Sequence, residues 1–301
     1  MKVGLVLPIA DDDGAGTPSW TRILELARRA EAGGIDSLWV FDHLVFRFPD
    51  EPESGLHEAW TMLVALAAAT ERAELGTIVL ATPFRPPAWT AKAVATADDI
   101  SGGRLIVGLG AGWHEPEFTA FGYPFDHRVG RFEEALVLIR RLLDGERVTL
   151  DGRWYQVADC VLLPPPRRAH VPILVASKGE RMLRLTARHA DAWNTAWFGV
   201  PDERWQSRLA DLRAACDAEG RDPASLEVTV GLSLDGSLQT ARPGAPNAIP
   251  ADVAAIADAF AAWAAGGVGH VQVDARPADE RTFDLVLEAR ERSGVATVSS
   301  R

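Results

Sequence analysis

Asp42 and His43 are the adjacent residues of this sequence best suited to acid–base chemistry. They follow the apolar run at 35–41, which predicts a buried strand. A histidine at the end of a strand can exchange a proton near neutral pH, and an aspartate beside it can accept a hydrogen bond from an N–H or hydroxyl group of a ligand. The pair could also be structural only, with Asp42 capping a turn and His43 satisfied by polar neighbours.

A second candidate site is the tripeptide Ser177-Lys178-Gly179, which ends an apolar run and opens a predicted helix. The free N–H groups and the positive dipole end of a helix N-terminus suit a phosphate group, and Lys178 would add a full positive charge. An ordinary capping turn with an exposed lysine would explain the same three residues. The sequence leaves both interpretations open.

The stretch "SGGRLIVGLGAGWHEPEF" at 101–118 has glycines at three alternate positions directly after an apolar run. A dinucleotide-binding turn needs its last glycine at position 113, where the helix packs closely on the strand, but this residue is Trp113. Pro116 and the segment 121–127 favour a loop over the helix that such a turn requires. We therefore expect Gly110 and Gly112 to let the backbone approach a flat ring, or to form an unusual turn.

Composition excludes several classes of partner. The formal net charge of -11 argues against non-specific binding to nucleic acid or to an anionic membrane. Neither the seven histidines nor the two cysteines have metal-ligand spacing, so we expect no catalytic metal. No apolar stretch approaches the roughly 20 residues that span a bilayer. The first apolar run is followed by three aspartates rather than a cleavage site, so we expect a cytoplasmic protein.

Strand-like and helix-like segments alternate along the chain. Eight apolar runs of strand length are each followed by a helical pattern, and they lie at 2–8, 35–41, 74–80, 104–110, 171–177, 190–196, 226–234 and 268–275. This alternation predicts a parallel sheet closed into a (β/α)8 TIM barrel, with residues 1–301 as a single domain. An irregular loop at 113–127 and a hairpin around Asp151-Gly152 are inserted between the fourth and fifth strands.

The barrel brings the candidate residues together, because active sites of such barrels lie at the carboxyl ends of the strands. Asp42, His43, Gly110, Gly112 and Ser177 all fall at strand ends. Several of the ten tryptophans also lie near strand ends and could line an aromatic pocket or simply belong to the core, namely Trp39, Trp60, Trp113, Trp193 and Trp197.

The segments "FDHL", "ADDISGGRLIVGLGAGWHEPEFTAFGYPF" and "VPILVASKGERMLRLTARHADAWN" closely resemble the luciferase-like monooxygenase superfamily, and within it the coenzyme F420-dependent oxidoreductases. The resemblance runs from about residue 2 to 200. It implies a barrel that binds a flavin or deazaflavin at the strand ends and that forms homodimers or larger homo-oligomers. It also implies a cis peptide bond at Ile78-Val79, behind the ring of the cofactor.

Carried over by position, the resemblance makes Asp42 a partner of the deazaflavin hydroxyl side, His43 the acid/base, and Ser177 to Gly179 the phosphate site. The chain departs from the family at Trp113, where sugar-phosphate and alcohol dehydrogenases of the family have a catalytic glutamate. Glu115 is the nearest carboxylate, and we take it as a second catalytic candidate. Lys178-Gly179 replaces a glycine pair of many relatives, which would strengthen phosphate binding.

The function expected from these features is hydride transfer between coenzyme F420 and a small organic substrate, with His43 exchanging the proton. One alternative is an FMN-dependent monooxygenase, and another is a non-catalytic flavin-binding protein, which would need no acid/base. The loops at 44–57, 113–127 and 235–250 would select the substrate, and they carry no motif that identifies it.

Overall fold

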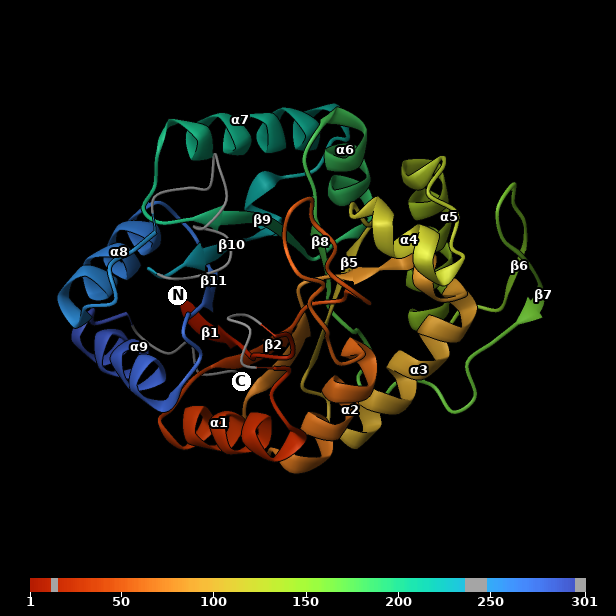
Figure 1. Ribbon diagram of the computed structural model, residues 1–301. Coiled ribbons are helices and arrows are strands. Elements are labelled where there is room, and N and C mark those ends of the chain that lie inside the picture. The colour runs from red at the N-terminus through yellow and green to blue at the C-terminus, as the bar shows by residue number, and fades with distance from the viewer. Residues whose placement is uncertain (12–15, 236–247, 296–301) are drawn as a thin grey trace.

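The computed structural model describes residues 1–11, 16–235 and 248–295. Within these residues, parallel strands form a closed barrel inside a ring of helices (Figure 1). The strands are β1 (Lys2–Val6), β2 (Ser37–Val40), β3 (Glu74–Thr77), β4 (Leu80–Ala81), β5 (Leu105–Gly110), β8 (Ile173–Ala176), β9 (Ala192–Phe198), β10 (Glu227–Ser233) and β11 (His270–Asp274). The strands pair in the order β3-β2-β1-β11-β10-β9-β8-β5, and β3 also pairs with β5, so the sheet closes and the predicted (β/α)8 barrel is confirmed.

Each barrel strand is followed by a helix that packs on the outside of the sheet (Figure 1). These helices are α1 (Trp20–Ala32), α2 (Ala59–Ala69), α3 (Pro87–Ile100), α5 (Arg128–Leu143), α6 (Glu180–His189), α7 (Glu203–Ala218), α8 (Val253–Ala265) and α9 (Glu280–Arg292). Two short 3-10 turns lie at Thr82–Phe84 and Pro223–Ser225. The expectation of one domain over residues 1–301 includes residues outside the described ranges and stays a prediction.

The third barrel strand consists of two pieces, β3 and β4, which both pair with β5. Between them lies the cis peptide bond Ile78-Val79 that the family resemblance implied. Ile78 still donates its N–H to the carbonyl oxygen of Val40 at 2.8 Å, so the chain stays attached to β2 across the interruption.

The insertion between β5 and β8 is more regular than the sequence suggested. Residues 113–127 were expected to be an irregular loop, but α4 (Glu115–Phe121) forms within them. Pro116 lies in the first turn of this helix, where its missing N–H costs no hydrogen bond, and Gly122 ends the helix with φ of 75°. Interpreting Pro116 as a helix breaker was therefore wrong.

The predicted hairpin is confirmed as β6 (Val148–Asp151) and β7 (Gln156–Cys160), which lie outside the ring of helices beyond α5 (Figure 1). The Glu134 carboxylate of α5 accepts hydrogen bonds from the backbone N–H groups of Arg153, Trp154 and Tyr155 at 2.9–3.1 Å. These three bonds attach the hairpin turn to the barrel wall.

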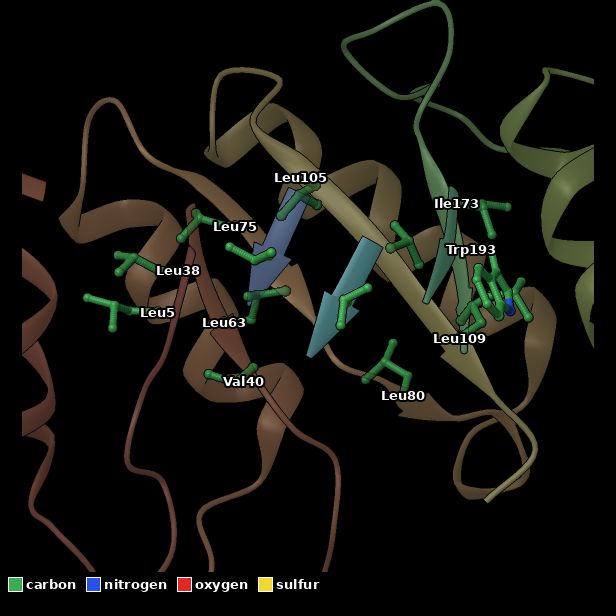
Figure 2. Packing of buried hydrophobic residues seen from close by; sticks show 14 of the residues in the cluster. Leu5, Leu38, Val40, Leu63, Leu75, Leu80, Leu105, Leu109, Ile173 and Trp193 are labelled. Atoms are coloured by element: carbon green, nitrogen blue, oxygen red, sulfur yellow. The ribbon is translucent and has the colours of Figure 1, made fainter. Parts of the chain in front are cut away.

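Apolar side chains form two layers, one on each side of the sheet. Alternate residues of the strands point outward and pack against the helices. Leu5, Leu38 and Leu75 do so on the side of the barrel where Leu63 of α2 lies, and Ile173 does so beside Trp193 (Figure 2). A smaller cluster is formed by Val6, Trp39, Ile78, Ile106, Leu174 and Ala192. The outer layer stabilises the barrel, and the smaller cluster contributes Ile78 to the wall of the cavity described below.

Two features are absent from the described residues. None of their helices is long and apolar enough to cross a membrane. Nor do three or more histidine, cysteine, aspartate or glutamate side chains in these ranges gather in a way that could hold a metal ion. Most of the substrate-selecting loop expected at 235–250, namely residues 236–247, lies outside the described residues.

Candidate active site

A cavity of about 500 Å³ lies where the barrel strands end at their carboxyl side. It is lined by most of the residues singled out from the sequence, namely Asp42, His43, Ile78, Val79, Gly110, Gly112, Trp113, Ser177 and Lys178. Gly179 is the next residue along the chain and forms the N-cap of α6. The structure therefore gathers residues that are up to 136 positions apart in the sequence, from Asp42 to Lys178, around one space.

His43 has a carboxylate partner that the sequence did not reveal. Its Nδ1 lies 2.9 Å from Oε1 of Glu117, and the other oxygen of Glu117 accepts the backbone N–H of Leu44 at 2.8 Å. The Glu117 side chain is 1% exposed, and His43 is 14% exposed. Both side chains line the cavity, so this is a buried histidine–carboxylate pair with access to a ligand.

Glu115, the carboxylate expected to act in catalysis, is exposed and does not line the cavity. Both glutamates lie in the first turn of α4, where acidic residues are favourable because of the helix dipole. Glu117 and Phe118 are the two buried residues of this helix. The "EPEF" segment signals the start of a helix, since proline is favoured in a first turn, but it does not show which of the two glutamates faces inward.

Asp42 is fully buried and forms a bidentate ion pair with Arg85, with N–O distances of 2.7 and 3.0 Å. It also accepts the N–H of Ala81 at 2.9 Å, which ties the end of β2 to β4. Burial lowers the pKa of Arg85, but its hydrogen bonds to Asp42 and Glu58 outweigh burial and raise that pKa above its ordinary value. Sequence reasoning missed Arg85, which lies in a turn before α3 and carries no motif.

The alternate glycines of β5 are required by a neighbouring strand. A Cβ atom on Gly108 would lie 1.8 Å from the Thr77 carbonyl oxygen, and one on Gly110 would lie 2.7 Å from a methyl group of Val79. Gly112 has φ of 75°, and its Cβ would lie 2.4 Å from the ring of Phe118. The first two therefore allow β5 to approach the chain around the cis bond, and Gly112 forms the unusual turn that was expected.

A second cis peptide bond between non-proline residues, Ala196-Trp197, also lies at the cavity. The sequence gave no signal for it. Of the five tryptophans considered for a pocket, Trp113 and Trp197 line the cavity, and Trp39, Trp60 and Trp193 are buried.

The residues expected to bind a phosphate at the start of α6 differ in the groups that they leave available to a ligand. Thr186 donates its hydroxyl to the Met182 carbonyl at 2.9 Å, so Ser177 must donate its own hydroxyl to Thr186 across their 2.8 Å contact. The Ser177 hydroxyl proton is therefore not available to a ligand. No side chain caps the N-terminus of α6, and Lys178 is exposed beside it.

Aromatic rings pack around His43, and one of them, Trp113, lines the cavity. The His43 ring lies 4.5 Å from Phe46 and 5.5 Å from Trp113, measured between ring centroids. Phe48 stacks on both Phe46 and Trp113, and Trp113 is 53% exposed. A ligand that reaches His43 therefore meets an apolar surface.

The chain matches the family model described as luciferase-like monooxygenase over residues 1–235. The chain belongs to this family. It is 35% identical over 237 residues to a phthiodiolone/phenolphthiodiolone dimycocerosates ketoreductase of Mycobacterium sp. (strain JLS), covering 71% of this chain and 62% of the relative. It is 33% identical over 217 residues to an F420-dependent glucose-6-phosphate dehydrogenase of Kineococcus radiotolerans, covering 71% and 63%. The chain thus matches less than two thirds of the length of each of these two relatives.

Among solved structures, an F420-dependent secondary alcohol dehydrogenase in complex with an F420-acetone adduct has a TM-score of 0.78 with 19% sequence identity. The match covers 96% of this chain and 97% of that chain. At this identity the likeness shows the barrel fold alone.

Proposed function

We propose that this protein transfers a hydride between coenzyme F420 and a small organic substrate, and that His43 exchanges the accompanying proton. The observation that carries the proposal is a single cavity with His43 and its buried carboxylate partner on one side and the start of α6 on another. The family membership and the relative named for F420 support the choice of cofactor.

The residues present fit a phosphate-bearing deazaflavin. The N-terminus of α6 has no side-chain cap, so its N–H groups are available to a phosphate, and Lys178 adds a charge that attracts it. The volume of about 500 Å³ is within the usual range of roughly 300 to 1,000 Å³ for ligand pockets. Ile78, Val79 and Gly110 would form the surface behind the ring, and Asp42 would lie at its edge.

The bound cofactor supplies a ring carbon that accepts or returns a hydride. The chain itself orients the substrate and moves a proton. His43 is the ionisable side chain in the cavity that the structure places against a carboxylate, so it would take the hydroxyl proton of an alcohol or return it to a carbonyl oxygen. The aromatic rings of Phe46, Phe48 and Trp113 would keep water away from this exchange.

The proposal extends to the substrate. The aromatic surface beside His43 favours a ketone or secondary alcohol that carries apolar groups, and one relative is named as a phthiodiolone/phenolphthiodiolone dimycocerosates ketoreductase. A homodimer or larger homo-oligomer in the cytoplasm completes the proposal. The family resemblance supports the oligomer, and the three aspartates that follow the first apolar run, in place of a cleavage site, support the location. Light scattering of the purified protein would test the oligomer.

The test of the cofactor is a titration of the purified protein with F420 and with FMN, followed by absorbance. We expect submillimolar or tighter F420 binding and FMN binding at least about tenfold weaker, a difference of about 1.4 kcal/mol. Anaerobic mixing of the F420-loaded protein with ketones should then oxidise reduced cofactor. Retention of FMN through purification, with oxygen consumption on reduction, would instead assign the monooxygenase function. Tight binding without turnover of any ketone or alcohol would leave a flavin-binding protein.

A further inference from the structure

His43 has two ring nitrogens in different surroundings. Nδ1 faces Oε1 of Glu117 at 2.9 Å. For Nε2, the structure gives no hydrogen-bond partner among the described residues, and the His43 side chain lines the cavity. If His43 meets a substrate oxygen, it must do so through Nε2.

Glu117 contacts both His43 and the backbone of the next residue. Oε1 faces the imidazole, and Oε2 accepts the N–H of Leu44 at 2.8 Å. The carboxylate is 1% exposed and lies in the first turn of α4, so it has no freedom to turn toward water. The Glu117 side chain thereby contacts both the backbone that follows β2 and the imidazole ring of His43.

From these contacts we propose that Glu117 is a positioning residue that holds neutral His43 as the Nδ1–H tautomer. An ionised carboxylate only accepts hydrogen bonds, so Nδ1 must carry the hydrogen that joins the two side chains. Nε2 then carries the lone pair and points to the ligand. The inference rests on the proposed function only in its assumption that His43 exchanges the substrate proton.

The proton step follows from this arrangement. In the oxidation direction, the O–H bond of an alcohol breaks, its proton goes to Nε2, and its electron pair becomes the second bond of the carbonyl as the hydride passes from the carbon to the oxidised deazaflavin of the proposed function. The imidazolium that forms is paired with the Glu117 carboxylate, which stabilises its charge in a buried position. In the reduction direction, Nε2 returns the proton to the carbonyl oxygen.

The decisive variant is Glu117→Gln, because it preserves shape and reverses the hydrogen bond. A glutamine has one oxygen, and the Leu44 N–H needs an acceptor at the place of Oε2. The amide NH2 group then faces Nδ1, which must accept. The variant therefore forces the Nε2–H tautomer, in which the ligand side of the ring carries a hydrogen and cannot take a proton.

The primary measurement is ¹⁵N NMR of the histidine rings in the protein without cofactor, at a pH where the His43 ring is neutral. The His43 signals are identified by their loss in His43→Asn. We expect hydrogen on Nδ1 in the wild type and on Nε2 in Glu117→Gln. Hydrogen on Nε2 in the wild type would overturn the proposal, and this result does not depend on whether Glu117→Gln folds.

The second measurement is steady-state kinetics of the cofactor-loaded enzyme. We expect Glu117→Gln to lower kcat about 10²- to 10⁴-fold with KM changed less than about threefold, as when a catalytic histidine is held in the wrong tautomer. An unchanged kcat would overturn the proposal, as would a loss of kcat in Glu115→Gln without one in Glu117→Gln. If the protein failed to bind F420, the proposed function would be contradicted, but the tautomer measurement would still decide the role of Glu117.

Discussion

His43 and His270 lie at opposite ends of the barrel, and they differ in their partners and in their access to a ligand. His270 is the first residue of β11, is 1% exposed, and places Nε2 at 2.7 Å from the hydroxyl of Ser37. The same hydroxyl accepts the indole N–H of Trp39 at 2.7 Å. His43 follows β2 at the other end, has a carboxylate partner, and reaches a cavity.

His43 and His270 differ because, within the part of the chain that the structure describes, only His43 has a carboxylate partner and access to a ligand. Burial, with the Lys2 ammonium and the N-terminus nearby, lowers the pKa of His270 to about 3, so this ring stays neutral at physiological pH. A neutral ring against a serine hydroxyl stabilises the inside of the barrel and exchanges no proton. A histidine on a barrel strand is therefore a catalytic candidate only where tertiary structure adds a charged partner and an opening.

The sharpest test of the comparison is to remove each ring in turn and to measure kcat and unfolding in parallel. We expect His43→Ala to lower kcat about 10²- to 10⁴-fold, the usual contribution of a positioned acid/base, with a nearly unchanged unfolding midpoint. His270→Gln, the matched variant, should keep kcat and lower the midpoint. If the two variants lowered kcat equally, the assignment of roles to the two ends would be wrong.

Arg85 belongs to a second feature of the cavity end, the buried ion pair with Asp42. Arg85→Leu leaves the fully buried Asp42 carboxylate without its bidentate partner. We expect the free energy of unfolding to fall by about 3 to 5 kcal/mol in urea titrations. The double variant Asp42→Asn/Arg85→Leu should recover part of this loss, and no recovery would indicate that the cost comes from lost packing.

His270 should also make stability depend on pH. Its pKa is about 3 in the folded protein and about 6.5 in the unfolded chain, so the unfolded chain binds more protons between these values. Stability is therefore fully present above about pH 6.5 and decreases as pH falls toward 3. Between pH 6.5 and 4 we expect the wild type to lose up to about 3 kcal/mol more than His270→Gln in urea titrations. Parallel curves for the two proteins would contradict a neutral buried ring.

The smallest expected effect concerns Lys178, whose charge should act on binding and leave folding alone. We expect Lys178→Ala to weaken F420 binding about tenfold, or about 1.4 kcal/mol, and to reduce its salt dependence, with an unchanged unfolding midpoint. Arg167→Ala is the matched control, since it removes the same charge from an exposed residue that precedes β8, at the other end of the barrel. Equal weakening in both variants would show that only net charge matters.

The fold was readable from the sequence because alternating strand and helix patterns depend on local periodicity. The apolar runs around Leu5, Leu38 and Ile173 are buried on the outer face of the sheet, as expected of strands covered by helices (Figure 2). Strand ends then located Asp42, His43 and Ser177 at one end of the barrel, since parallel strands share a direction. The local reading failed at Pro116, where a first-turn proline was taken for a helix breaker.

By itself, the sequence determined the barrel, the hairpin and the strand ends, because periodicity and turn residues act over a few neighbours. Only the tertiary structure decided which carboxylate meets which base. Glu117 lies 74 positions from His43, and Arg85 lies 43 positions from Asp42. A buried glutamate and an exposed glutamate in the same helical turn look alike in a sequence. The direction in which α4 packs on the barrel buries Glu117 against His43 and leaves Glu115 in solvent.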